Sequence, residues 1–146
     1  MRKKYILITI LLCAFFLFYS FENKKPKTKT KPDIAGVILS FDDAYVDEWF
    51  ATDKELRKYS WKGIFFVSKI NTLSLSEIKK LLELQKEGNE IGGHGFNHYN
   101  ATTFLSNHTV DEYLKQEIDP MLDLMPFYGL KVTSFAYPYG GRTKAL

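Results

Sequence analysis

From residue 33 onward, short apolar runs alternate with longer segments in which apolar residues recur every three or four positions. Three of the runs are rich in β-branched and aromatic residues, as is typical of strands that are buried on both faces, and the third run along the chain, at 89–92, is a brief one. The pattern predicts four strands, at residues 34–40, 63–68, 89–92 and 132–136.

The segments between these runs predict helices. Residues 47–59 carry aromatic and aliphatic side chains among charges, as an amphipathic helix does. The spacing from Ser74 to Glu77 and from Thr109 to Glu112 is that of a capping box, which predicts helices running to about residues 87 and 125. Pro120 predicts a kink or break in the second of these helices.

Strands that alternate with helices in this way predict an α/β fold with a parallel sheet and right-handed crossovers. Four such units amount to about half of a (β/α) barrel. We therefore assign residues 33–146 to one domain, the N-terminal part of such a barrel.

The N-terminal segment differs from this pattern. After a basic start, residues 5–21 run for seventeen positions without a charge, which is just long enough for a membrane-spanning helix. A cleaved signal peptide is the alternative, but bulky residues stand where a small-x-small cleavage site is expected. We favour an apolar signal-anchor helix over residues 1–21, followed by a basic linker at 22–32. Either interpretation places the domain outside the cytoplasm, on the cell membrane or secreted.

Charge is distributed unevenly along the chain. Residues 1–32 hold eight Lys or Arg against one acid, whereas the remainder holds twelve basic and sixteen acidic residues, a net charge of −4. The domain is therefore mildly acidic, which argues against nucleic acid as a partner.

Polar and aromatic residues follow three of the predicted strands. Asp42 and Asp43 follow the first strand, His94 and His98 follow the third, and residues 137–140 (Tyr-Pro-Tyr-Gly) follow the fourth. In parallel α/β folds the carboxyl ends of the strands are where active sites are built. We therefore expect these residues to form one site.

The residue types at this edge indicate a metal site. A four-residue separation would place the two imidazoles on one side of a helical turn, and one carboxylate would complete an open, catalytic type of zinc site. One Asp of the pair can bind metal while its neighbour holds a water molecule. Taken separately, each motif has a simpler explanation, because an Asp pair also occurs at helix N-caps and turns, and a His pair at this spacing also arises by chance.

Three segments together resemble the first three motifs of a known family. They are Ser40–Asp43, Gly88–His98 and Phe135–Gly140, and their order and spacing are similar to those of the polysaccharide deacetylases. This family comprises the NodB-like enzymes of carbohydrate esterase family 4, which adopt a distorted (β/α) barrel. The third motif is closest to the poly-N-acetylglucosamine deacetylase branch. The resemblance covers residues 34 to about 142, so we expect a truncated fragment whose remaining motifs, including a general-acid His, would lie beyond residue 146.

The resemblance implies metal-dependent hydrolysis of N-acetyl groups on an amino-sugar polysaccharide such as a polymer of N-acetylglucosamine. Asp43, His94 and His98 would bind the divalent cation, Zn²⁺ by preference, and Asp42 would be the general base. Tyr139 would offer its backbone N–H to the oxyanion and would line the substrate site with Tyr137 and Pro138.

Two positions depart from the family pattern. Gly95 stands where Ser or Thr is usual, and Ala136 stands where many members carry an Arg that pairs with the catalytic Asp. These departures leave two alternatives open. One is a membrane-tethered, non-catalytic module that binds carbohydrate or metal, and the other is an enzyme of the same fold that acts on another amide.

Overall fold

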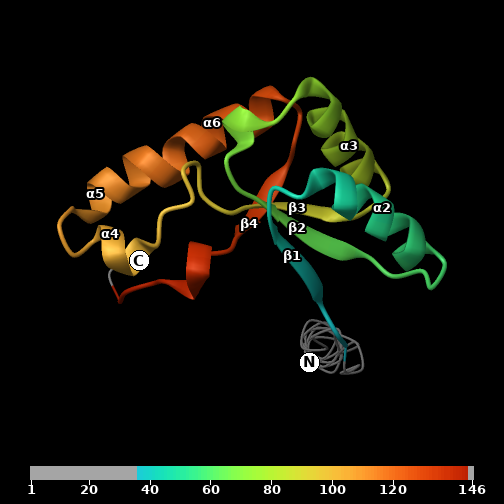
Figure 1. Cartoon of the computed structure of the whole chain (residues 1–146), viewed down its shortest axis with the longest axis horizontal. Coiled ribbons are helices and arrows are strands. Elements are labelled where there is room, and N and C mark those ends of the chain that lie inside the picture. The colour runs from blue at the N-terminus through green and yellow to red at the C-terminus, as the bar shows by residue number, and fades with distance from the viewer. Residues whose placement is uncertain (1–35, 145–146) are drawn as a thin grey trace, which may run out of the picture. The chain divides into compact units, whose positions relative to one another are not determined.

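The computed structural model describes residues 36–144, so the predicted signal-anchor at 1–21 and linker at 22–32 lie outside the described residues. Within 36–144, no helix combines the length and apolar character needed to cross a membrane. The strands are β1 (Leu39–Asp43), β2 (Gly63–Val67), β3 (Glu90–Gly93) and β4 (Val132–Phe135). The α-helices are α2 (Val46–Arg57), α3 (Leu75–Lys86), α4 (Ala101–Phe104), α5 (Val110–Tyr113) and α6 (Asp119–Phe127), as Figure 1 shows. Short 3-10 turns cover Ile70–Thr72 and Pro138–Gly140.

The four strands form a parallel sheet in the order β1-β2-β3-β4, as the alternating pattern predicts. Residues that share a register position at the carboxyl edge are Asp43, Val67, Gly93 and Phe135. The residues that follow them therefore emerge from the sheet at the same level.

The prediction for the first strand was wrong in its position. The apolar run at 34–40 suggested a strand there, but β1 begins at Leu39, where pairing with Gly63 of β2 starts. Val37 and Ile38 precede the pairing and are 86% and 79% exposed. Asp42 and Asp43 are consequently the last two residues of the strand and do not follow it.

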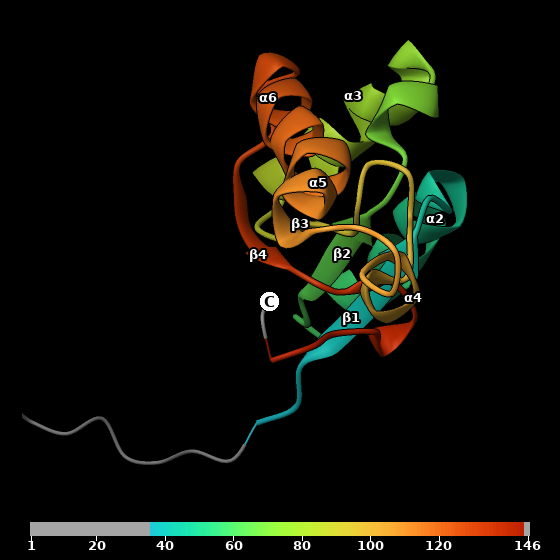
Figure 2. The same cartoon turned by 90° about the vertical axis from the view of Figure 1, so that its left-hand side faces the viewer.

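The core lies between the sheet and the helices. Phe65 and Val67 alternate with half-buried residues along β2 and contact the same cluster as Trp49 of α2, Leu81 of α3 and Met121 of α6. Figures 1 and 2 show these three helices gathered on one side of the strands. The helices thus pack against one side of the sheet, and the loops that follow the strands lie at its carboxyl edge.

Both predicted capping boxes are present. The Ser74 hydroxyl accepts the Glu77 N–H and the Glu77 carboxylate accepts the Ser74 N–H, and Thr109 and Glu112 repeat the arrangement. Each box satisfies backbone donors that a helix N-terminus would otherwise leave unpaired.

The helical stretch from residue 110 to 127 changes type just before Pro120. Residues 114–118 are π-helical, and α6 then begins at Asp119. Proline has no N–H, so Pro120 cannot donate to the carbonyl of Gln116 four residues earlier. The expected kink or break thus takes the form of a widened turn within a stretch that stays helical.

Candidate metal centre

Backbone conformation at the carboxyl edge of the sheet is unusual. Of the five described non-glycine residues with positive φ, three belong to the predicted site: Asp43 (91°), His98 (67°) and Tyr139 (58°). This conformation is costly for residues that carry a Cβ, and such residues concentrate at functional sites.

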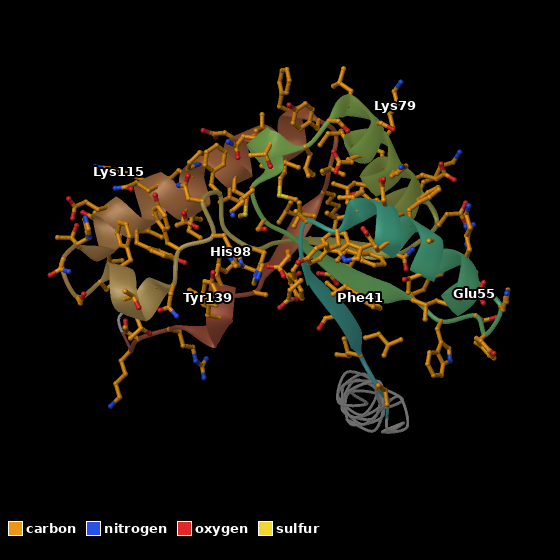
Figure 3. The ribbon with its side chains drawn as sticks, in the orientation of Figure 1. Phe41, Glu55, Lys79, His98, Lys115 and Tyr139 are labelled. Carbon is orange, nitrogen blue, oxygen red and sulfur yellow. The ribbon has the colours of Figure 1, made fainter. Side chains whose placement is uncertain are left out.

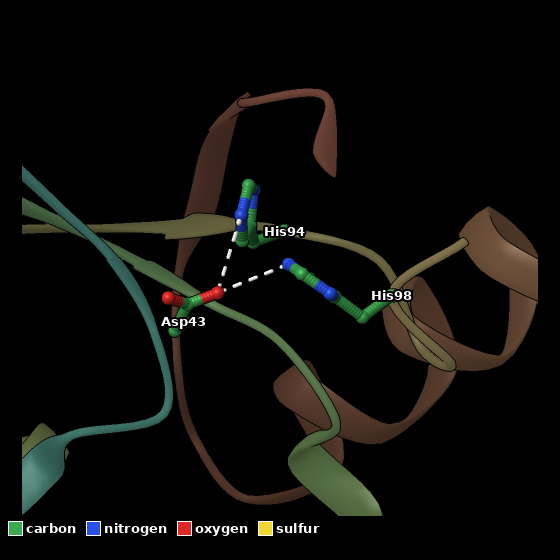
Figure 4. A group of neighbouring side chains, drawn as sticks. All are labelled: Asp43, His94 and His98. Atoms are coloured by element: carbon green, nitrogen blue, oxygen red, sulfur yellow. Dashed lines mark ion pairs between the residues drawn. The ribbon is translucent and has the colours of Figure 1, made fainter. Parts of the chain in front are cut away.

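Asp43, His94 and His98 lie together. Oδ1 of Asp43 is 3.0 Å from Nε2 of His98 and 3.8 Å from Nε2 of His94, and the three candidate ligand atoms lie within 4.8 Å of one another (Figure 4). The structure therefore brings together the three residues that the sequence proposed as metal ligands.

His94 is buried and its orientation is fixed. Its Nδ1 lies 2.8 Å from the carbonyl oxygen of Ala136, which follows β4. Because a carbonyl only accepts, Nδ1 donates in this contact, and Nε2 is the ring nitrogen that faces Asp43. In metal sites, the ring nitrogen of a histidine ligand that does not bind the metal usually donates such a hydrogen bond, which fixes the orientation of the ring.

His98 reaches the site by a route that the sequence did not predict. Residues 94–99 form a loop, not a helical turn, and the loop turns through left-handed conformations at Gly95 and His98. Burial lowers the pKa of His98, and the neighbouring His94 lowers it further, while Asp43 acts in the opposite direction. A lowered pKa favours the neutral imidazole, which is the form that binds metals.

Figure 3 shows Tyr139 beside His98, with their ring centroids 4.8 Å apart. The Tyr139 side chain is 73% exposed, so it contacts the site and solvent together. Pro138 is buried, and the ring of Tyr137 lies edge-on to Phe135. The roles of these three residues toward a substrate stay predictions.

Asp42 is exposed on β1 one residue before Asp43. Within residues 36–144 its carboxylate forms no hydrogen bond or ion pair, so no side chain fixes its orientation. Its role as the general base remains a prediction.

One residue at the site was missed by the sequence reasoning. Glu117, in the π-helical turn, is fully buried and accepts backbone N–H groups from the loop that carries His98. A signal was present, because Glu117 lies four residues from both Tyr113 and Met121 on the buried stripe of the helix. A charged residue on such a stripe indicates a specific buried partner.

The three residues fit a divalent cation. Two imidazoles and one carboxylate are the ligand set of an open zinc site. Nε2 of His98 is buried and has no hydrogen-bond partner among the described residues, although Asp43 lies 3.0 Å away. A buried nitrogen without a hydrogen bond is costly, and a cation between it and the carboxylate would remove that cost.

Comparison with known proteins identifies the family of this chain. The polysaccharide deacetylase family matches residues 29–146, and the chain belongs to that family. The peptidoglycan-N-acetylmuramic acid deacetylase PdaC of Bacillus subtilis is 32% identical over 121 residues. That match covers 80% of this chain and 24% of PdaC.

Solved structures share the fold. The structure of the peptidoglycan deacetylase PdaC from Bacillus subtilis matches with a TM-score of 0.61 and 29% identity, over 80% of this chain and 55% of that one. A carbohydrate esterase family 4 pseudoenzyme from Bacillus anthracis matches with a TM-score of 0.60 and 22% identity, over 78% and 39% of the two chains. The chain thus spans about half of these solved chains, or less. Because the fold also occurs in a pseudoenzyme, activity must be argued from the site.

Proposed function

We propose that this protein is a metal-dependent hydrolase that removes N-acetyl groups from an amino-sugar polysaccharide. The observation that carries the proposal is the convergence of Asp43, His94 and His98 at one edge of a parallel sheet in a member of this family. The reaction consumes water, breaks the carbon–nitrogen bond of the acetamido group, and releases acetate and a free amine.

The chain's own residues divide the work. Asp43, His94 and His98 would hold the cation, with Zn²⁺ as the preferred metal for this ligand set. The cation would supply Lewis acidity that acidifies water and polarises the acetyl carbonyl. Asp42 would take the proton from the attacking water, and the Tyr139 N–H would donate to the oxyanion.

The substrate is inferred from chemistry and from the relatives. PdaC is named for peptidoglycan, and peptidoglycan and poly-N-acetylglucosamine present the same acetamido group on a sugar ring. Tyr137, Pro138 and Tyr139 would line the groove for that ring. Such polymers lie outside the cytoplasm, which accords with the proposed anchoring of the domain to the membrane by residues 5–21.

The test is acetate release by the Zn²⁺-loaded, full-length protein from N-acetylglucosamine oligomers and from peptidoglycan. Asp42→Asn should keep one equivalent of metal and lower turnover by about 10²–10⁴-fold, because general-base catalysis contributes on that scale. A wild-type protein that binds one equivalent of Zn²⁺ and releases no acetate from either polymer would refute the proposal. Loss of metal in Asp42→Asn would instead show that the two carboxylates have other roles.

A second function draws on the exposure of Asp42, whose carboxylate no neighbour holds in place. A non-catalytic module would bind the sugar polymer through the same metal and aromatic residues without turnover. In that case the wild type and Asp42→Asn would bind the polymer equally and neither would release acetate.

A further inference from the structure

Glu117 is a buried carboxylate without an ionic partner. It is fully buried, and no Lys, Arg or His side chain within residues 36–144 forms an ion pair with it. Burial of a lone carboxylate is costly unless several donors surround it. The donors around Glu117 therefore indicate what it does.

The donors all come from the loop that carries His98. Oε1 of Glu117 accepts the Asn97 N–H at 2.9 Å, and Oε2 accepts the Tyr99 N–H at 3.2 Å. The carboxylate is thus bound on both sides of the histidine by the amides of the same turn.

The helix backbone next to Glu117 supports the same loop. The carbonyl of Glu117 accepts the Phe96 N–H at 3.1 Å, and the carbonyl of Gln116 accepts Nδ2 of Asn97 at 2.8 Å. The Gln116 carbonyl is available because Pro120 has no N–H to donate to it. Two carbonyl groups of the π-helical turn therefore accept hydrogen bonds from the loop.

Gly95 completes the fit from the loop side. Its φ is +85°, and Oε2 of Glu117 lies so close that a Cβ at this position would collide with it. The glycine that departs from the family pattern stands where the carboxylate needs space.

We propose that Glu117 is the positioning residue of the metal centre, since it fixes the loop so that Nε2 of His98 faces Asp43. The inference rests on the metal site of the proposed function. Glu117 has no role in the chemical step, and it acts only through the placement of His98.

The decisive variant is Glu117→Gln, which keeps size and removes one acceptor. Its amide nitrogen would face a backbone N–H of the loop, so Asn97 or Tyr99 would lose its partner. We expect Zn²⁺ and Co²⁺ to bind about 10–100-fold more weakly, as is typical when support for a ligand is lost. The visible absorption of bound Co²⁺ should also change, because the His98 ring is no longer held in one position.

Asp53→Asn is the matched control. Asp53 is another buried carboxylate, and it pairs with Asn89 and Arg57 between helix and sheet without contacting the metal loop. Its amide variant should lower the melting temperature and leave metal affinity unchanged. If both variants lost affinity equally, the loss would reflect general destabilisation and the proposal would be wrong.

Two further measurements keep the proposal testable. Asn97→Ala removes only the contact with Gln116 and should weaken Zn²⁺ binding about two- to tenfold, even if Glu117→Gln does not fold. In the metal-free protein, amide exchange at Asn97 and Tyr99 should be faster in Glu117→Gln than in Asp53→Asn. Wild-type affinity in folded Glu117→Gln, or unchanged exchange, would overturn the proposal. A wild type that binds no Zn²⁺ would defeat the proposed function, whereas exchange would still decide whether Glu117 holds the loop.

Discussion

The two ends of the parallel sheet both contain buried polar side chains, but they satisfy them differently. At the amino end, Asn89 accepts the Gly63 N–H at 3.0 Å and donates to Asp53 at 2.7 Å and to the Leu84 carbonyl at 3.1 Å. Arg57 lies 2.9 Å from the same carboxylate. At the carboxyl end, Nε2 of His98 and Nε2 of His94 face the same carboxylate oxygen of Asp43, at 3.0 and 3.8 Å, and the three candidate ligand atoms lie within 4.8 Å of one another.

The difference distinguishes the structural framework at the amino end of the sheet from the candidate metal site at its carboxyl end. Polar groups that satisfy one another inside a fold hold elements together, and they need nothing from outside. Two imidazole nitrogens and a carboxylate oxygen that converge on one point form instead the ligand set of a divalent cation. Asn89 belongs to the motif that resembles the family's second motif, yet its contacts place it with the framework.

The variant with the largest expected effect at the carboxyl end of the sheet is His98→Ala. It removes one of three candidate ligands and should weaken Zn²⁺ binding more than about 100-fold, beyond the loss that follows from changing a residue behind a ligand. Calorimetric titration of the metal measures this. His108→Ala is the matched control, because His108 is exposed and stacks on Phe104 away from the site. Equal losses in the two variants would contradict the assignment.

A change at the amino end of the sheet should lower the stability of the protein and leave its metal binding unchanged. Asn89→Ala leaves the Gly63 N–H and the Asp53 carboxylate short of a partner, which should cost about 2–4 kcal/mol. Denaturant unfolding measures the loss. Zn²⁺ affinity should be unchanged under conditions where the variant is folded, and a marked loss of affinity would show that the two ends are coupled.

Two glycines with positive φ sharpen the comparison. Gly88 and Gly95 have φ near +90°, but a Cβ at Gly88 has ample room while one at Gly95 meets Glu117. Gly88→Ala should cost about 1–2 kcal/mol for the conformation alone. Gly95→Ala should cost more and should also weaken metal binding. If their unfolding free energies fall equally, the contact with Glu117 carries no weight.

The smallest effect concerns Tyr113, whose hydroxyl is buried without a hydrogen-bond partner in the described chain. Burial, together with Glu117, raises the pKa of Tyr113 from 10.0 to about 12. The folded state then keeps the proton longer than the unfolded state, so stability is full below pH 10 and falls as pH rises toward 12. Tyr113→Phe should lose this part of the alkaline decline, measured as the wild-type minus variant difference in melting temperature from pH 9 to 11.5. An identical decline in both proteins would show that Tyr113 does not contribute.

The sequence predicts the sheet well, and it predicts that the three candidate metal ligands lie together, for physical reasons. β2 and β4 combine apolar residues with clear stops. Asp43 ends β1 and His94 directly follows β3, at the register level where the parallel strands end. The capping-box patterns predict where α3 and α5 begin, because the hydrogen bonds of a capping box join residues only three positions apart. Local signals therefore fix most element boundaries to within two residues.

What the sequence could not show depends on contacts between distant segments. The start of β1 is set by its pairing with Gly63 and not by its own apolar residues. The route of the loop to His98 depends on Glu117, which is about twenty residues away in the chain. A spacing of four residues favoured a helical turn there, and tertiary hydrogen bonds produced a loop instead.

Pro120 has a consequence for engineering. Replacing it with alanine would restore a backbone N–H, allow a regular α-helix, and gain helix propensity in a stretch that now contains a π-helical turn. The same change would straighten the π-helical turn and so move the Gln116 carbonyl, which now accepts Nδ2 of Asn97. A substitution chosen to make the protein more heat-resistant would thus loosen the histidine loop, so thermal stability and metal affinity pull in opposite directions at this proline.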